Sequence, residues 1–305
     1  MLTAGLGTRL RPLTDVRAKP AVPVAGEPIA RRVARWLVAG GVTEITLNLH
    51  HLPQTLTAVL GDGSDLGARI RYSWEQPQVL GSAGGPRQAL DIVGAEHVVL
   101  VNGDTLTDLN LPDLWIPHQR SAALVTLALV PNLEPRRYGG VLLDDDGAVI
   151  GFVPKGPRAE GSYHFIGVQV AARRAFATLA PGVPANSIGG LYDRLIAQHP
   201  GRVRGVVVKA AFWDIGTVDD YWRTSKAFSA GEAATGTGVC IAPSARMTRS
   251  IVWDDVSIGD HAVIDECIVT DGVQVPEGSA HTRAILLRGP DGRLVSVPCS
   301  VDHRE

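Results

Sequence analysis

The chain has few cysteines and no long apolar segment. It contains three cysteines, Cys240, Cys267 and Cys299, without a Cys-x-x-Cys pair, which we interpret as reduced packing residues rather than disulfides or metal ligands. The longest apolar run, residues 122–130 interrupted by Thr126, is far too short to cross a bilayer. No charged and then apolar leader precedes the first motif. We therefore expect no membrane partner and a cytoplasmic location.

An excess of charge of either sign is also absent. The 29 basic and 31 acidic residues are interspersed and give a net charge of −2, without a basic stripe that would bind nucleic acid. Any phosphate binding must therefore be local. What the chain does have is size: 305 residues, 45% of them hydrophobic, are enough for one large and one small domain. Because residues 229–238 are rich in Ala, Gly and Thr, we expect these domains over 1–230 and 231–305.

The most informative segment lies near the amino terminus. Gly5 and Gly7 follow a short apolar stretch, and two cations, Arg9 and Lys19, come close behind. A glycine-rich turn after a strand frees backbone N–H groups to converge on phosphate oxygens, so the segment predicts triphosphate binding. The dinucleotide fingerprint requires a third glycine where Leu10 stands, and the Gly-Lys-Ser/Thr of a P-loop is absent. The two glycines alone are explained equally well by a plain surface turn.

The strand expected before this loop is short. Only Met1–Ala4 precede the first glycine, whereas strands usually have about five or six residues. We expect an upstream start codon, and greater thermal stability and activity for a chain extended at this end.

Strand-like and helix-like stretches alternate over the first 230 residues, as they do in an α/β sheet. Because apolar runs such as residues 97–101 are typical of buried strands, several elements can be placed. Helices are expected over 29–38, 86–93 and 218–228, and strands over 44–49, 68–74, 97–101, 124–130, 140–143, 149–153, 203–209 and 211–213.

After residue 238 the apolar period changes. Val256, Ala262 and Ile268 recur at every sixth position. Six-residue spacing is typical of a left-handed β-helix, in which each short strand stacks on the coil below. We expect about two coils, with a small β-meander as the alternative. We interpret the segment as structural, with a homo-oligomer contact as its role.

Two aspartates occupy positions where ligands gather in α/β proteins. Asp104 follows the apolar run 97–101, and Asp214 precedes a helix that begins near Thr217. Ligands bind at the carboxyl ends of the strands in open α/β sheets. Each aspartate also has a structural explanation, a tight Asn-Gly turn for the first and a helix cap for the second.

A family resemblance adds to these patterns. Residues 2–24, with Thr-Arg-Leu-x-Pro-Leu-Thr followed by Lys-Pro and Pro-Val, closely resemble the signature of the sugar-nucleotide pyrophosphorylases, nucleotidyltransferases that join an NTP to a sugar 1-phosphate. The likeness covers nearly the whole chain. It implies an α/β fold with a Rossmann-like mixed sheet flanked by helices, of the GT-A-like nucleotidyltransferase kind, and a short C-terminal left-handed β-helix-like segment.

The resemblance also implies roles for individual residues. Asp104 and Asp214 would hold one Mg²⁺, Arg9 would bind the leaving pyrophosphate, Lys19 would neutralise charge near the α-phosphate, and Lys155 would grip the sugar 1-phosphate. The phosphate oxygen of the sugar is already a nucleophile at neutral pH, so no general base is required. Nucleotide contacts are expected from Ala4, Gly5, Gly7, Thr8, Gly81, Ala83, Gly84 and Gly140.

Substrate choice is less sharply marked. Residues 80–85, Leu-Gly-Ser-Ala-Gly-Gly, are most similar to the corresponding segment of mannose-1-phosphate guanylyltransferases, so we expect GTP and mannose 1-phosphate or a related sugar. Pro154 and Phe165 replace a glutamate and an asparagine of the family pattern, which favours another sugar or recognition by His164 or Tyr138. The alternatives are uridylyl, adenylyl or thymidylyl transfer to another sugar 1-phosphate, or a non-catalytic regulatory paralogue that binds a nucleotide sugar.

Overall fold

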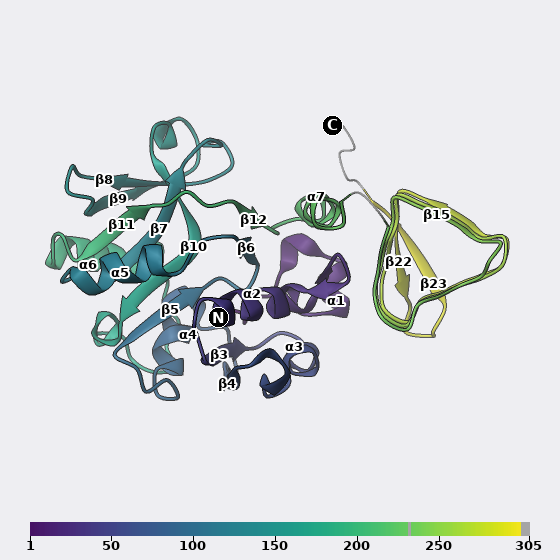
Figure 1. Ribbon diagram of the computed structural model, residues 1–305, viewed down its shortest axis with the longest axis horizontal. Coiled ribbons are helices and arrows are strands. Elements are labelled where there is room, and N and C mark those ends of the chain that lie inside the picture. Colours follow the sequence, from purple (N-terminus) through teal and green to yellow (C-terminus); the bar gives the residue numbers. More distant parts are fainter. Residues whose placement is uncertain (231–232, 300–305) are drawn as a thin grey trace. The chain divides into compact units, whose positions relative to one another are not determined.

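The computed structural model describes residues 1–230 and 233–299, and its contacts divide the chain into two compact units (Figure 1). Unit 1 contains Met1–Leu6 and Val33–Asp214, and unit 2 contains Gly7–Arg32 and the residues from Ile215 onward. This grouping follows spatial contacts rather than chain order. The domain boundary expected at residue 230 stays a prediction.

Helices and strands alternate through the first 230 residues, so the structure confirms the α/β class. No helix in the described part of the chain combines the length and apolar character that a membrane span requires. The helices are α1 Leu13–Val16, α2 Ile29–Ala39, α3 Pro53–Leu60, α4 Gly81–Ala89, α5 Pro112–Arg120, α6 Tyr192–Gln198 and α7 Val218–Phe228. The strands are β1 Pro23–Val24, β2 Glu27–Pro28, β3 Glu44–Leu49, β4 Arg69–Trp74, β5 His97–Val101, β6 Thr105–Thr107, β7 Val125–Pro131, β8 Gly140–Leu143, β9 Val149–Val153, β10 Tyr163–Ala172, β11 Val203–Val207 and β12 Phe212–Asp214.

The main sheet of unit 1 is mixed, as expected. Its order is β11-β7-β10-β8-β9, with β5 also paired to β10, and β11 runs parallel to β7 while β10 is antiparallel to its neighbours. The core gathers around β7, which is buried from residue 125 to residue 130. Helix α5 packs against β7 and β10, and α6 packs against β9 and β11. The ten-residue strand β10, which joins these parts, was not anticipated from the sequence.

The residues before the first glycine form part of a sheet despite their small number. The Leu2 N–H donates to the Val101 carbonyl at 2.8 Å, and the Asn48 N–H donates to the Met1 carbonyl at 3.4 Å. The stub therefore runs between β3 and β5, and a parallel bridge joins Leu2 to Asn102. The expectation of an upstream start codon is untested and stays a prediction.

The helix expected over 86–93 is wrong in its position, because α4 spans Gly81–Ala89. Its glycines are held by close packing rather than by local preference. A Cβ placed on Gly84 would lie 2.6 Å from the Val183 carbonyl oxygen, and one on Gly85 would lie 2.2 Å from a Glu75 carboxylate oxygen. Sequence rules treat neighbouring glycines as helix breakers, and here tertiary contacts override that preference.

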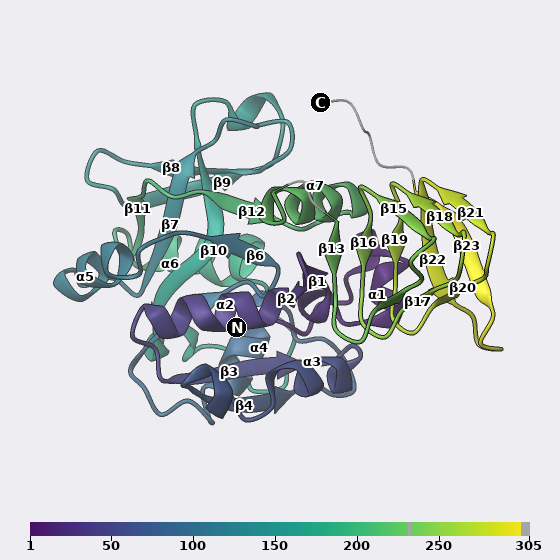
Figure 2. The same cartoon turned by 45° about the vertical axis from the view of Figure 1, so that its right-hand side comes forward.

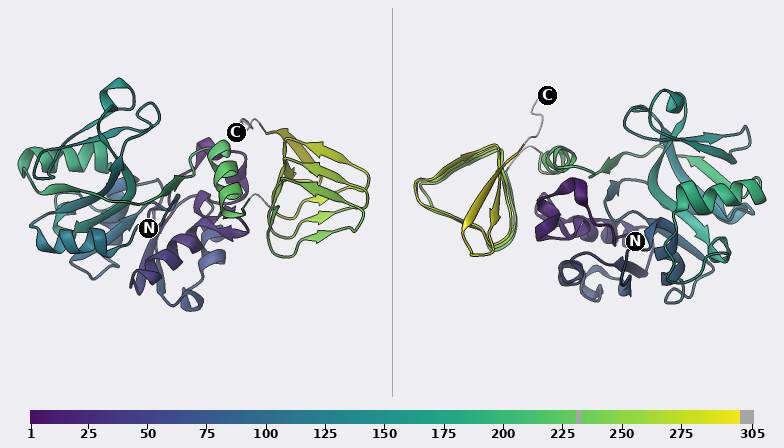
Figure 3. Two further views of the ribbon diagram at one scale, coloured as in Figure 1. Left: turned by 45° about the horizontal axis from the view of Figure 1, so that its top comes forward. Right: turned by 180° about the vertical axis from the view of Figure 1, so that it is seen from behind.

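The C-terminal strands of unit 2 form a triangular β-helix whose coils overlie one another in Figure 1 and lie side by side in Figure 2. Figure 3 shows the same coils from two further directions. The parallel pairing excludes the alternative of an antiparallel β-meander. The strands are β13 Ala234–Thr235, β14 Cys240–Ile241, β15 Arg246–Thr248, β16 Ile251–Val252, β17 Ser257–Ile258, β18 Val263–Asp265, β19 Ile268–Val269, β20 Gln274–Val275, β21 Ala280–Thr282, β22 Ala284–Arg288 and β23 Leu294–Pro298.

The coils are more numerous and slightly shorter than the six-residue period predicts. Ala234, Ile251, Ile268 and Ile285 stand in register, which makes three coils of 17 residues (251 − 234, 268 − 251 and 285 − 268) before the antiparallel pair β22–β23. The expectation of about two coils is therefore wrong. Each coil has two six-residue sides and one five-residue side, so a search at period six loses the repeat at every third corner. Cys267 and Cys299 are buried, whereas Cys240 is exposed and does not pack as expected.

A buried histidine of unit 1 makes the stability of the fold depend on pH. The ring of His118, on α5, contacts Thr126 Oγ1 and His97 Nδ1, each at 2.8 Å. Burial lowers the pKa of His118 from 6.5 to about 4, with smaller contributions from the neighbouring charges of His97 and Arg174. The folded form therefore resists a proton that the unfolded chain accepts near pH 6.5.

We predict that the free energy of unfolding declines as pH falls from 6.5 towards 4, because protonation favours the unfolded chain over this range. His118→Gln removes the titrating group and should make the decline shallower. Urea unfolding at pH 7, 6, 5 and 4 measures both slopes. Equal slopes in the two proteins would contradict the prediction.

Candidate functional site

The pairing of β6 with β12 brings the two predicted metal ligands together. Asp214, the last residue of β12, stands opposite Thr105 in the antiparallel register, and Asp104 directly precedes Thr105. The structural explanation for Asp214 is excluded, because Thr217 caps α7 and forms a capping box with Asp220. Asp214 on β12 and Asp104 in the turn before β6 are both half-buried and lie at the same end of this strand pair.

The beginning of the glycine loop lies at the same edge of unit 1. The Gly103 N–H donates to the Leu2 carbonyl at 2.9 Å, directly before Asp104. Since the stub and β5 are parallel, their carboxyl ends meet there, and Ala4 and Gly5 leave the stub beside the turn that carries Asp104. This is the edge at which ligands bind in open α/β sheets.

The pair of aspartates suits Mg²⁺ better than it suits a metal held by protein alone. Magnesium is usually bound through one or two carboxylates together with substrate phosphates and water. Within residues 1–230 and 233–299, no group of three or more His, Cys, Asp or Glu side chains is arranged to hold a metal. Asp104 and Asp214 therefore fit a divalent cation that reaches the protein together with a phosphate ligand.

The second part of the glycine loop is built within unit 2. Gly7 has φ of +62°, and a Cβ on it would lie 2.8 Å from Thr14 Cγ2 and 3.2 Å from Lys19 Cβ. The Thr14 hydroxyl donates to the Gly7 carbonyl at 2.9 Å, and the loop then turns through a 3₁₀ segment, Thr8–Leu10. Lys19, only 9% exposed, is therefore packed against the loop near which it was expected.

Arg9 is exposed and lies beside the start of α7. A Cβ on Gly216 would lie 3.3 Å from Arg9 Nη1 and 3.2 Å from Asp220 Oδ2. The missing side chain at Gly216 therefore allows a guanidinium and a capping carboxylate to share this position. The role of Arg9 in binding pyrophosphate stays a prediction.

Lys155 follows β9 and is exposed, in a part of unit 1 where Gly140 is also placed. Gly140 pairs with Val153 across β8 and β9, and a Cβ on Gly140 would lie 2.1 Å from Ser162 Oγ. The Lys155 backbone nitrogen lies 3.8 Å from the position that a Cβ on Gly139 would take. The glycines thus let the lysine-bearing turn approach β8 closely.

Three aromatic rings stack at a cavity of about 500 Å³ in the same unit. The Tyr138 and His164 ring centroids are 4.1 Å apart, and Phe212 lies 5.0 Å from His164. Burial lowers the pKa of His164 to about 4, so its imidazole is neutral at pH 7 and can either donate or accept a hydrogen bond. Both residues proposed as alternative sugar-binding groups therefore line one cavity, next to Gly139.

The predicted nucleotide segment 81–84 is partly occupied by contacts within the chain. The N–H groups of Ala83 and Gly84 both donate to the Ala185 carbonyl, at 2.9 and 3.1 Å, and both residues are buried. Gly81, with φ of +77°, is half-buried. Their contact with a nucleotide stays a prediction, and in this arrangement Gly81 and Ser82 form the accessible part of the segment.

Glu75 was missed from the sequence. It is fully buried and accepts hydrogen bonds from the Leu80 N–H and from Asn48 Nδ2, each at 2.6 Å. The Asn48 side-chain oxygen in turn accepts from the Thr3 N–H at 2.6 Å. This chain of contacts ties the stub before the glycine loop to the nucleotide segment. The available signal was its place directly after a strand, the same signal that identifies Asp104.

Comparison with known proteins identifies the family of each part of the chain. Residues 1–231 match the nucleotidyl transferase family, and residues 230–283 match the GlmU-like C-terminal hexapeptide family. The chain therefore belongs to the nucleotidyl transferase family. These matches confirm the predicted membership of the sugar-nucleotide pyrophosphorylases and the left-handed β-helix at the C-terminus.

Individual relatives agree in family and differ in the substrates they are named for. The chain is 29% identical over 292 residues to mannose-1-phosphate guanylyltransferase from Mycobacterium tuberculosis, covering 91% of this chain and 81% of the relative. It is 34% identical over 224 residues to N-acetylmuramate alpha-1-phosphate uridylyltransferase from Neisseria meningitidis, covering 72% and 92%. The crystal structure of HddC from Yersinia pseudotuberculosis aligns with 74% of this chain and 97% of its own, at a TM-score of 0.63 and 24% identity, which shows the fold.

We predict that Glu75→Gln lowers the free energy of unfolding by about 1–3 kcal/mol, because the amide cannot accept both buried hydrogen bonds. Glu160→Gln, at an exposed position, is the matched control and should leave stability unchanged. Urea denaturation followed by fluorescence compares the two. Unfolding midpoints that coincide would show that the Glu75 network carries no stability.

Proposed function

We propose that this protein catalyses Mg²⁺-dependent transfer of a nucleotidyl group from GTP to mannose 1-phosphate or a related sugar 1-phosphate, with release of pyrophosphate. The observation that carries the proposal is the antiparallel pair β6–β12, which sets Asp214 opposite the residue that follows Asp104. The extended similarity to a mannose-1-phosphate guanylyltransferase, over 91% of this chain, supports GTP and mannose 1-phosphate as the first substrates to test.

The proposed residues divide the work by charge and position. The amides of the loop from Gly5 to Thr8 and the Arg9 guanidinium would hold the β- and γ-phosphates, which leave as pyrophosphate. Lys19 would neutralise charge on the α-phosphate. No general base is needed, because the sugar phosphate oxygen attacks as an anion and pyrophosphate departs as one.

Asp104 and Asp214 would hold Mg²⁺, which when bound supplies neutralisation of the phosphate charge. The register of β6 and β12, which sets Asp214 opposite the residue after Asp104, supports this assignment. Holding the reacting groups in place before the reaction accounts for a large share of the catalysis of phosphoryl and nucleotidyl transfer.

The sugar side is proposed to lie in unit 1, where Lys155 would grip the 1-phosphate. The aromatic cavity at Tyr138 and His164 offers a ring surface and a neutral imidazole for sugar hydroxyls. Pro154 and Phe165 cannot form side-chain hydrogen bonds, so sugar recognition falls to such neighbouring groups.

A second candidate is uridylyl transfer to a different sugar 1-phosphate. The specific observation that favours it is the 34% identity to an N-acetylmuramate alpha-1-phosphate uridylyltransferase over 72% of this chain.

Homo-oligomer contact through the β-helix remains a prediction.

A substrate matrix tests the function. Pyrophosphate release should be measured for GTP, UTP, ATP, CTP and dTTP against a panel of sugar 1-phosphates, with and without Mg²⁺. Metal-dependent turnover fastest with GTP and mannose 1-phosphate supports the proposal, and a maximum with UTP supports the second candidate. The absence of turnover with every pair, while the folded protein binds a nucleotide sugar, would identify a regulatory paralogue instead.

We predict that Asp104→Asn and Asp214→Asn each lower kcat by roughly 100-fold or more, because each removes an anionic ligand of the metal. Thermal unfolding should stay cooperative. Asp145→Asn, at the exposed tip between β8 and β9, is the matched control and should retain full activity. Wild-type turnover in the Asp104 variant would refute the metal assignment.

A further inference from the structure

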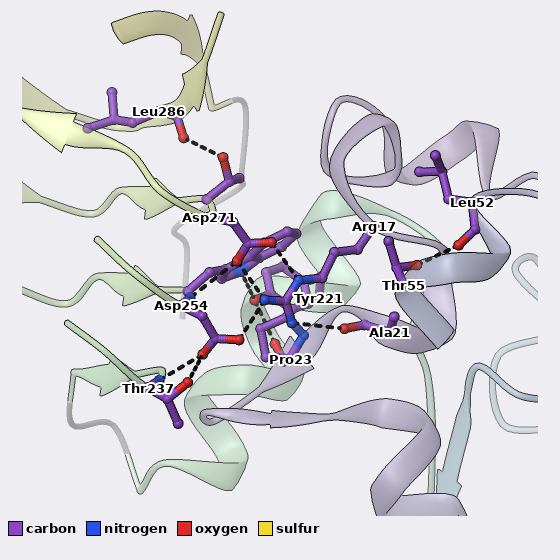
Figure 4. Close-up of polar contacts among 12 residues, drawn as sticks. Arg17, Ala21, Pro23, Leu52, Thr55, Tyr221, Thr237, Asp254, Asp271 and Leu286 are labelled. Atoms are coloured by element: carbon purple, nitrogen blue, oxygen red, sulfur yellow. Dashed lines mark hydrogen bonds and ion pairs between the residues drawn. The ribbon is translucent and has the colours of Figure 1, made fainter. Parts of the chain in front are cut away.

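An arginine close to the glycine loop is held by two carboxylates of the β-helix (Figure 4). Arg17 Nε lies 2.6 Å from Asp271 Oδ2, and Arg17 Nη2 lies 2.5 Å from Asp254 Oδ2 and 2.7 Å from Asp271 Oδ1. All three residues belong to unit 2. The Arg17 side chain is only 11% exposed, and its guanidinium lies 5.5 Å from the centre of the Trp253 ring. The positive charge of Arg17 is therefore paired with carboxylates of the same unit.

The two carboxylates are fixed by the β-helix itself. Asp254 and Asp271 stand 17 residues apart, which is one coil, so they stack at the same corner. The Thr237 N–H and hydroxyl donate to Asp254 Oδ1 at 2.7 and 3.0 Å, and the Asp254 N–H lies 3.2 Å from Asp271 Oδ1. Two stacked carboxylates repel each other, and the positive charge of Arg17 offsets that repulsion. The hydrogen bonds to both carboxylates in turn fix the orientation of the Arg17 guanidinium.

A second contact joins the same parts of unit 2. The Tyr221 hydroxyl, on α7, donates to the Pro23 carbonyl at 2.8 Å and accepts from the Trp253 indole N–H at 2.9 Å. Both aromatic side chains are fully buried. The segment from residue 17 to residue 23 is thus bonded to the β-helix directly at Arg17 and through Tyr221 of α7 at Pro23.

This segment leads directly to the glycine loop. Lys19 is two residues beyond Arg17 and begins a short 3₁₀ turn, Lys19–Ala21. The Lys19 side chain packs on Gly7, and the Thr14 hydroxyl bonds the Gly7 carbonyl. A displacement of Arg17 would therefore also displace Lys19 and the glycine loop at Gly7, because a few buried residues connect them.

We propose that the β-helix positions the nucleotide-binding loop through Arg17, which Asp254 and Asp271 hold in one place. This inference rests on the proposed function of the loop at Gly7 and Lys19. Arg17 does not touch the substrate in this scheme and acts as a positioning residue. A loop ordered in advance binds a triphosphate without the entropic cost of ordering it, so the clamp should govern affinity for the NTP and leave the sugar 1-phosphate unaffected.

Three variants test the clamp: Arg17→Met, Asp271→Asn and the double variant. Each single change should raise KM for the NTP about tenfold, with KM for the sugar 1-phosphate within twofold of the parent. The double variant should add little to Arg17→Met, because both changes break one contact. Arg17→Lys, which keeps the charge without the bidentate geometry, should restore part of the affinity.

The matched control is Arg249→Met. Arg249 also binds a β-helix carboxylate, with Nη2 2.9 Å from each oxygen of Asp265, but this pair lies within the β-helix and does not involve residues 7–23. It should leave both KM values unchanged. Should Arg17→Met fail to fold, Asp271→Asn retains a side chain of the same size and carries the test.

Amide hydrogen exchange of residues 7–19 in the absence of substrate gives a readout that does not depend on activity. The clamp requires faster exchange there in Asp271→Asn and unchanged exchange in Arg249→Met. Unchanged exchange, or faster exchange with unchanged NTP affinity, would overturn the inference. If the parent protein binds no NTP, the proposed function fails, and the exchange comparison alone then decides whether Arg17 holds the loop.

Discussion

The antiparallel pair β6–β12 is the contact on which the proposed chemistry depends. It joins a strand that follows β5 to a strand that ends unit 1, and it sets Asp214 opposite Thr105. Directly opposite residues in such a pair have Cα atoms about 4.5–5.5 Å apart, so the backbone of Asp214 is held close to Thr105, the residue that follows Asp104. The proposed cation site has these two carboxylates as its protein ligands, so its geometry depends on the spacing that the strand pair sets.

Several glycines serve close packing rather than flexibility. At Gly85 and Gly140 a side chain would collide with Glu75 and Ser162, and at Gly216 it would displace Arg9 or Asp220. Such contacts let backbone segments from distant parts of a unit approach one another. The positions of the residues proposed to bind phosphate and sugar therefore depend on neighbouring glycines, whose lack of a side chain leaves room for these close contacts.

The sequence predicted the class, most strands of unit 1 and the C-terminal coils, because apolar periodicity and motif spacing are local properties. It placed α4 wrongly and missed β10, Glu75 and the role of Arg17, because these depend on long-range contacts. The position of α4 follows from packing against Val183 and Glu75. The number of coils was underestimated because a five-residue side interrupts the six-residue period in each coil. The joint role of the two aspartates was expected from resemblance and stays a prediction; the structure adds the register that sets Asp214 opposite Thr105.

The 17-residue coil has a consequence for how the C-terminal region can vary in length. Arg17 holds the coils that carry Asp254 and Asp271, whereas the hairpin β22–β23 that follows them pairs within itself and with β19. Whole coils can therefore be inserted after Asp271 without shifting the carboxylate ladder. An insertion of one or two residues between the aspartates would rotate them out of line. The length of this region can therefore change only by whole coils if the two carboxylates are to stay stacked.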